Sequence, residues 1–217
     1  MSIPLRPRVL LADDHLLVAE ALKSLLAPEF DLVGMVADGR ALLEAAGTLR
    51  PDVIVADISM PQLNGIDALT QLRQNGDQVP VVFLTMHQDA NFARRAFEAG
   101  ASGFVLKHSA PAELILAIHA ALEGRTYLSP QLPGEVMETM KQGAGNSPPD
   151  QLASLTLRQR EVLQLLAEGS LAKEIAYKLS ISSRTVEFHK YQMMEALGLH
   201  TNAELIHFAI KHGLVEL

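Results

Sequence analysis

The 217-residue sequence contains no cysteine, which excludes disulfide bonds, thiolate metal sites and a cysteine nucleophile. It has no run of 18 apolar residues, so it predicts no transmembrane helix and no membrane partner. The first apolar run, Val9 to Ala12, is too short for a signal peptide and ends in two aspartates. These features favour a protein that works in the reducing, cytoplasmic compartment.

The chain also lacks an excess of basic residues. Its net charge of −7 divides into −5 for residues 1–127, −2 for residues 128–153 and zero for residues 154–217. A strongly basic domain attracts nucleic acid through its overall field, and no part of this chain has such a field. Any nucleic-acid binding by the C-terminal part must therefore depend on local side chains.

Residues 8–124 alternate short apolar runs with longer amphipathic stretches. Runs such as VIVA and VVFLT are almost continuously apolar, which is typical of parallel strands buried on both faces. Stretches such as LLVAEALKSLLA repeat apolar residues at three and four positions and predict helices. Five strands alternating with five helices predict a flavodoxin-like α/β domain with a doubly wound, five-stranded parallel sheet.

The rest of the chain predicts a linker and a small all-α domain of four helices. Gly and Pro are frequent over residues 142–153, and a short helix is predicted over 130–140. Thr156 with Gln159 forms a capping-box pattern, and the caps of two later helices are Ser182 or Ser183 and Thr201 or Asn202. The predicted limits are 1–127 for the α/β domain, 128–153 for the linker and 154–217 for the helical domain.

Polar side chains gather where the predicted strands end. Asp13 and Asp14 follow the first strand, Asp57 follows the third, Thr85 ends the fourth and Lys107 follows the fifth. Carboxyl ends of parallel strands share one edge, and three carboxylates there need a cation, for which Mg²⁺ suits an all-oxygen site. Lys107 and Thr85 can hold phosphate oxygens, so the set predicts phosphoryl transfer to a carboxylate. A single aspartate of this kind is often only a helix cap.

Three histidines, His15, His87 and His108, lie near the same strand ends and match no metal-binding spacing. The aspartate pair, the Asp57-Ile-Ser-Met-Pro run with Gly65, and the later threonine and lysine together resemble the receiver domain of bacterial two-component response regulators. The resemblance covers about residues 7–124.

The resemblance implies that Asp57 accepts phosphate from a partner histidine kinase. It implies that Asp14, Asp57 and the backbone carbonyl of Ser59 ligate Mg²⁺, and that Asp13 assists, often through water. Lys107 would act in catalysis, and Thr85 and Phe104 would form the switch. Phe104 has no hydroxyl, so its inward movement would depend on packing alone, and it is also predicted to be a core residue.

The helical part resembles the helix-turn-helix domain of the LuxR type, and the whole chain is therefore similar to the NarL/FixJ class. The class implies binding to double-stranded DNA and a homodimer, at least on DNA. The features that match are Leu155-Thr156, Arg160-Glu161-Val162-Leu163, Ala167-Glu168-Gly169, Lys173-Glu174-Ile175-Ala176, Thr185-Val186 with His189, and Leu197-Gly198.

The third predicted helix of this domain has two distinct faces. Val186, Met193 and Leu197 fall on one side, which is expected to pack inward, while Phe188 and Tyr191 fall on the other. Exposed aromatics indicate a binding surface, either the DNA major groove or a protein contact. The predicted DNA-binding residues are Lys173, Ser183, Arg184, Thr185, Glu187, Phe188, Lys190, Tyr191 and Gln192.

Within this set, the lysines and the arginine are expected to contact phosphates, and Phe188 to contact thymine methyl groups. Glu187 would accept from a cytosine amino group, and Gln192 would pair with adenine. The LuxR type often has a lysine where this chain has Glu187, so a monomer is expected to bind weakly and to rely on dimerisation. The last helix, residues 201–212, has an apolar stripe that suits either a dimer contact or packing against the third helix.

The leading functional prediction is a DNA-binding regulator controlled by phosphorylation, with no enzyme turnover beyond phosphotransfer and slow autodephosphorylation. An enzyme with an aspartyl-phosphate intermediate is the first alternative. Such enzymes typically place a carboxylic acid two residues after the nucleophile, where this chain has Ser59. The second alternative is a regulator that uses the receiver only as a protein-interaction module.

Overall fold

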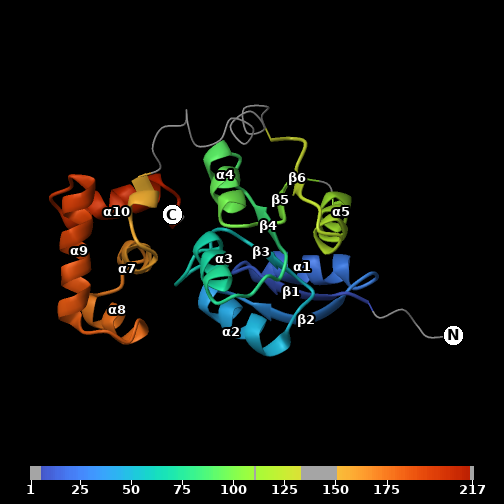
Figure 1. Ribbon diagram of the computed structural model, residues 1–217, viewed down its shortest axis with the longest axis horizontal. Helices are drawn as coiled ribbons and strands as arrows, with labels where there is room; N and C mark the ends of the chain where they lie inside the picture. The colour runs from blue at the N-terminus through green and yellow to red at the C-terminus, as the bar shows by residue number, and fades with distance from the viewer. Residues whose placement is uncertain (1–5, 110, 133–150, 216–217) are drawn as a thin grey trace. The chain divides into compact units, whose positions relative to one another are not determined.

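The structure is a computed structural model, and it describes residues 6–109, 111–132 and 151–215. The chain forms two compact units, an α/β unit and a helical unit, which are treated separately (Figure 1). The elements of the α/β unit are β1 (Arg8–Ala12), α1 (Leu16–Leu26), β2 (Asp31–Val36), α2 (Gly39–Leu49), β3 (Val53–Ala56), α3 (Gly65–Gln74), β4 (Val81–Thr85), α4 (Ala90–Glu98), β5 (Gly103–Leu106), α5 (Pro111–Leu122) and β6 (Tyr127–Leu128).

The sheet is entirely parallel, with the strand order β2-β1-β3-β4-β5-β6. The chain runs outward from β1 in both directions, which confirms the doubly wound topology predicted from the alternating pattern. The prediction of five strands missed β6, whose two residues are too few to show a period. The predicted domain boundary between residues 127 and 128 falls inside this strand.

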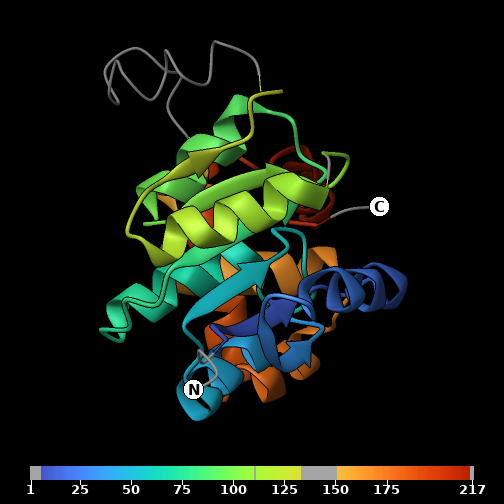
Figure 2. The ribbon, with the colours of Figure 1, turned by 90° about the vertical axis from the view of Figure 1, so that its right-hand side faces the viewer.

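Helices cover both faces of the sheet. On one face, α1 and α5 pack on alternate strand residues such as Val9, Val55 and Val105, and Figure 2 looks onto this side of the unit. The opposite residues of the pleat, among them Leu10 and Phe83, are also buried and face α2 and α3. Burial on both faces explains why these strands read as unbroken apolar runs.

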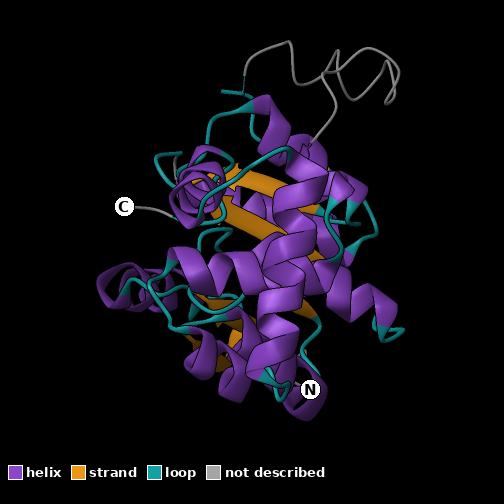
Figure 3. Ribbon diagram, turned by 90° about the vertical axis from the view of Figure 1, so that its left-hand side faces the viewer, coloured by secondary structure: helices purple, strands orange, loops and turns teal. Residues whose placement is uncertain are grey.

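From Gln151 onward, every described element of regular secondary structure is a helix; Figure 3 draws helices in purple and the turns between them in teal. The core of the helical unit joins all four α-helices and contains Val186 and Met193, which confirms the inward face predicted for α9; Leu197 is half-buried at its edge. The elements are a 3-10 helix (Gln151–Ser154), α7 (Leu157–Ala167), α8 (Ala172–Lys178), α9 (Ser183–Leu197) and α10 (Asn202–Lys211).

The predicted caps of the helical unit are present. Thr156 forms a reciprocal capping box with Gln159, the Ser182 hydroxyl accepts from the backbone of α9, and Thr201 begins α10 in the same way. Gly198 ends α9 with a left-handed conformation (φ 66°), which a glycine adopts without strain. Four helices in about the predicted places follow from these local signals.

Part of the predicted linker, residues 133–150, lies outside the described residues, and so does most of the helix predicted over 130–140. In the described part of the chain, no helix is both long enough and apolar enough to cross a membrane.

Candidate functional site

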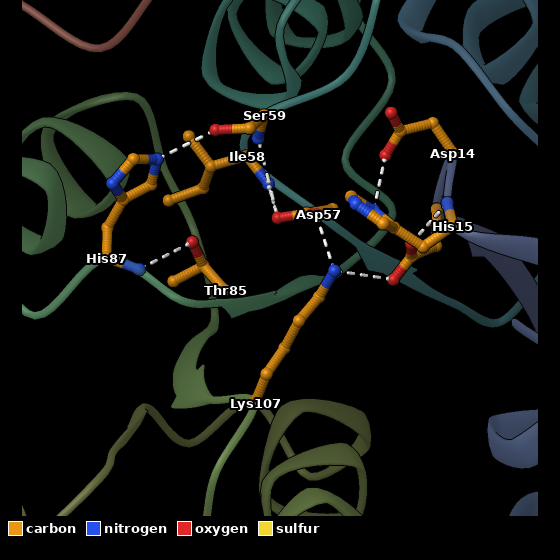
Figure 4. A network of polar contacts seen from close by, with 9 residues as sticks. Asp14, His15, Asp57, Ile58, Ser59, Thr85, His87 and Lys107 are labelled. Carbon is orange, nitrogen blue, oxygen red and sulfur yellow. Dashed lines mark hydrogen bonds and ion pairs between the residues drawn. The ribbon is translucent and has the colours of Figure 1, made fainter. Parts of the chain in front are cut away.

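The carboxyl ends of β1, β3 and β5 bring three charged side chains into contact (Figure 4). The Nζ atom of Lys107 lies 2.6 Å from Oδ2 of Asp57 and 2.9 Å from Oδ2 of Asp13. Both carboxylates are buried, so little water screens the interaction. Of the strand-end residues that the sequence predicted to converge, Asp13, Asp57 and Lys107 are in direct contact, with the ammonium group between the two carboxylates.

The loop after β3 holds Asp57 in position. Its Oδ1 atom accepts hydrogen bonds from the backbone N–H groups of Ile58, at 2.7 Å, and Ser59, at 3.4 Å. The N–H of Gly65 then donates to the Ile58 carbonyl at 2.8 Å and brings the start of α3 against the strand end. A Cβ atom at Gly65 would lie 2.2 Å from the Asp57 carbonyl oxygen, so only glycine allows this approach.

Burial and charge act in opposite directions on this group of side chains. Burial raises the pKa of Asp57 from 3.8 to about 6, although the neighbouring Lys107 ammonium opposes the rise. Burial by itself lowers the pKa of Lys107, but the two carboxylates outweigh it, and the net pKa is raised. Near neutral pH the site therefore holds an ammonium group beside a carboxylate that is costly to keep charged.

A metal ion fits the same edge of the sheet. Ligand atoms of Asp13, Asp14, His15 and Asp57 all lie within 4.8 Å of one another. The carboxylate oxygens are the ligands that Mg²⁺ prefers, and a cation would offset the repulsion among them. The histidine spacing did not predict that Nδ1 of His15 lies 2.9 Å from Oδ1 of Asp14. A role of the Ser59 carbonyl as a ligand stays a prediction.

Asp13 and Asp14 do not act as the side-chain cap of α1. The N-cap residue of this helix is His15, which makes no side-chain cap hydrogen bond. Its backbone N–H donates to Oδ1 of Asp13 at 2.9 Å. The structure therefore does not support the alternative that Asp13 or Asp14 is simply the N-cap of α1.

The end of β4 joins the site through His87, a residue whose contacts the sequence did not predict. The backbone N–H of His87 donates to Oγ1 of the buried Thr85 at 3.2 Å, and its Nε2 lies 2.7 Å from Oγ of Ser59. The imidazole stacks on Phe92 of α4, with ring centroids 3.9 Å apart. Only its position two residues after Thr85 hinted at this role.

Phe104 lies fully buried in β5, beside Phe83 of β4. This placement accords with the core role expected for it, and its part in a switch stays a prediction. Lys107 lies three residues after Phe104, just beyond the end of β5, and its Nζ donates to Oδ2 of Asp57.

The raised pKa of Asp57 predicts a titration near pH 6 in the absence of metal. Because this pKa exceeds the ordinary 3.8, the charged form of Asp57 opposes folding above pH 6, and that cost disappears as the pH falls from 6 towards 4. ¹³C NMR of the aspartate carboxyl carbons measures the midpoint, and Asp57→Asn identifies the resonance. Mg²⁺ should move the midpoint down, since a cation favours the carboxylate. A midpoint below 4.5 without metal would contradict the prediction.

In the helical unit, the outer face of α9 presents the predicted aromatic pair. The Phe188 side chain is 55% exposed and that of Tyr191 is 66% exposed, as the helical spacing predicted.

The polar residues predicted to bind DNA differ in their exposure. Arg184 is exposed one turn before Phe188, and Gln192 is half-buried. Lys173 is exposed on α8. Ser183 and Thr185 lie half-buried in the first turn of α9, where the Thr185 N–H donates to the Ser182 hydroxyl.

One pairing on this face was missed from the sequence. The Nζ atom of Lys190 lies 3.1 and 3.0 Å from the two carboxylate oxygens of Glu187, one helical turn away. Glutamate and lysine three residues apart are neighbours on a helix, so the spacing carried the signal. The two residues had been assigned separate DNA contacts, and the contacts of all these side chains with DNA stay predictions.

Two known families match separate parts of the chain. Residues 9–119 match the family described as "Response regulator receiver domain", and residues 153–209 match "Bacterial regulatory proteins, luxR family". The transcriptional regulatory protein MctR of Rhizobium johnstonii is 36% identical over 96% of this chain and 95% of its own length. The transcriptional regulatory protein UhpA of Salmonella typhimurium is 35% identical over 92% and 95%.

Solved structures give the same result. A LuxR-family two-component response regulator from Aurantimonas is 39% identical, with a TM-score of 0.59 over 61% of this chain and 96% of that chain. RcsB of Salmonella typhimurium is 26% identical, with a TM-score of 0.63 over 96% and 98%. A complex of RcsB with DNA is 27% identical, with a TM-score of 0.56 over 94% and 97%.

Fold and site together define a receiver domain followed by a LuxR-type helix-turn-helix domain. The chain belongs to the DNA-binding response regulators of two-component systems, in which these two domains are joined.

Proposed function

We propose that this chain is a cytoplasmic protein whose Asp57 accepts a phosphoryl group from a partner histidine kinase, and that this controls DNA binding by a homodimer through α9. The contact that carries the proposal is the 2.6 Å approach of Lys107 to Asp57, within a cluster that suits a metal. Asp14, Asp57 and the Ser59 carbonyl would hold Mg²⁺, with Asp13 assisting.

An oxygen of Asp57 would attack phosphorus while the phosphorus–nitrogen bond of the donor breaks and the imidazole nitrogen takes up a proton. Bound Mg²⁺ supplies positive charge for the phosphoryl oxygens. Lys107 is placed to bind one of those oxygens, and the Thr85 hydroxyl can donate its hydrogen to another. His87 touches both Thr85 and α4, so it offers a route by which Thr85 affects that helix.

The geometry around Ser59 supports a signalling role rather than sustained turnover. Its hydroxyl lies 2.7 Å from the His87 ring, and it offers no carboxylic acid that could protonate a leaving group. A phosphoryl group on Asp57 is therefore expected to persist as a signal.

In the helical unit, α9 would enter the major groove of DNA. Arg184 and Lys173 are exposed and would contact phosphates, with Ser183 and Thr185 at the start of the helix. Phe188, Tyr191 and Gln192 would reach the base edges. Glu187 stands where the LuxR type often has a lysine.

The test compares DNA binding with and without a small phosphodonor and Mg²⁺, for the wild-type chain and Asp57→Asn. The duplexes are first enriched from a random pool by the treated wild-type chain, and affinity is measured by fluorescence anisotropy. We expect the treated wild type to bind more tightly and Asp57→Asn to show no response. Equal affinities in all four measurements would instead favour a regulator that uses the receiver only as a protein-interaction module.

A further inference from the structure

The ion pair between Glu187 and Lys190 lies within the predicted set of DNA-binding residues on α9. Glu187 is 57% exposed, whereas the Lys190 side chain is only 12% exposed. The lysine stem thus lies largely against the protein, and its ammonium group reaches the surface beside Glu187. Phe188 follows Glu187 directly, and its ring is exposed on the same helix.

This pair removes one of the two positive charges of α9. Apart from His189, whose pKa is lowered by burial, the helix carries only Arg184 and Lys190 as basic residues, against Glu187 and Glu195. An isolated surface pair contributes little to stability, so stability does not account for a carboxylate at this place. What the pair changes most is the charge that the helix presents to a polyanion.

We propose that Glu187 acts as a built-in competitor for DNA phosphate, which holds Lys190 in the ion pair on DNA and leaves base discrimination to Phe188 and Tyr191. The inference rests on the proposed function of α9 as the recognition helix. It assigns Lys190 no phosphate contact, in contrast to the expectation from the sequence.

On DNA, the Glu187 carboxylate and the DNA phosphates compete for the Lys190 ammonium. If Lys190 moved to a phosphate, Glu187 would face the phosphates without a cation, and like charges at short distance repel. The closed pair therefore carries no net charge towards the DNA. Binding to any sequence is weaker than it would be with a lysine free of a carboxylate partner.

Weaker binding to DNA of every sequence helps a regulator to distinguish its target from other DNA. Binding to random DNA scales with the number of phosphates that a protein neutralises, and each such contact adds about 0.9 to the slope of log K against log salt. Contacts to thymine methyl groups do not follow this rule, because they involve no ions. Glu187 therefore raises the share of binding that depends on sequence.

The experiment uses the full-length chain, treated with phosphodonor and Mg²⁺, and a 30-base-pair duplex pool of random sequence as the probe. Glu187→Gln should bind the pool about 3- to 10-fold more tightly at 0.1 M salt, and the salt slope should steepen by about 0.9 per protomer. The matched control is Glu195→Gln, which makes the same change in charge at another exposed position of α9 and should alter affinity less than about 2-fold.

The double variant Glu187→Gln, Lys190→Met decides the role of the lysine. A closed, neutral pair predicts that this variant keeps the wild-type slope and affinity. A slope lower by about 0.9 would mean that Lys190 contacts phosphate in the wild-type chain, and it would overturn the inference. No change for Glu187→Gln, with the wild type still binding, would also overturn it while leaving the proposed function intact. Failure of the wild type and all variants to bind the pool would count against the proposed function itself.

Discussion

Replacing Asp57 by asparagine is expected to reduce phosphorylation of the chain by a small phosphodonor about 1000-fold or more. An amide oxygen is a far weaker nucleophile than a carboxylate, and asparagine supplies no negative charge for a metal. The neighbouring Asp13 is held by Lys107 at 2.9 Å and by the His15 N–H at 2.9 Å. It is therefore not expected to take over as the acceptor.

Intact mass spectrometry measures the addition of one phosphoryl group after treatment with the donor and Mg²⁺. Asp31→Asn is the matched control, because Asp31 is exposed at the beginning of β2, at the opposite end of the strands. It should be labelled like the wild type. Labelling of Asp57→Asn at the wild-type rate would place the acceptor on another side chain and remove the basis for a receiver function of this site.

The parts of the structure that the sequence predicted follow either from local sequence patterns or from the parallel topology of the sheet. Runs such as VIVA are apolar on both faces because helices cover both faces of the sheet. The capping box at Thr156 and the glycine at 198 set helix ends within their own turns. The position of Asp57 beside Lys107 was predictable because parallel strands place their carboxyl ends at one edge.

The contacts that escaped prediction depend on side-chain conformation or on very short segments. Ser59 and His87 are 28 residues apart, and no periodic pattern connects them. The strand of Tyr127–Leu128 has too few residues to show alternation. Glu187 and Lys190 stand at a pairing distance on a helix, yet the same spacing also allowed each to point at DNA. Local pattern therefore located the site but not the arrangement of charge within it.

Phe188→Ala is expected to weaken binding to the enriched duplexes by about 30-fold, which corresponds to about 2 kcal/mol of base contact. The ring is 55% exposed, so its removal should cost the fold little, and the loss should appear in binding rather than in unfolding. If the ring contacts thymine methyl groups, replacing thymine by uracil in the same duplexes should weaken the wild-type chain by a similar factor. It should hardly affect the variant.

Tyr177→Ala is the matched control, because Tyr177 is 88% exposed on α8, outside the proposed recognition helix. It should bind the duplexes like the wild type, with the same response to uracil. The alternative use of the α9 aromatics is a protein–protein contact, and the same variants separate the two. Under that alternative, Phe188→Ala would shift the monomer–dimer equilibrium in sedimentation measurements, and uracil would have no effect. If the Phe188 ring instead contacts thymine, uracil should weaken binding and Phe188→Ala should leave the monomer–dimer equilibrium unchanged. The methyl group that uracil lacks belongs to the DNA and not to a second copy of the chain.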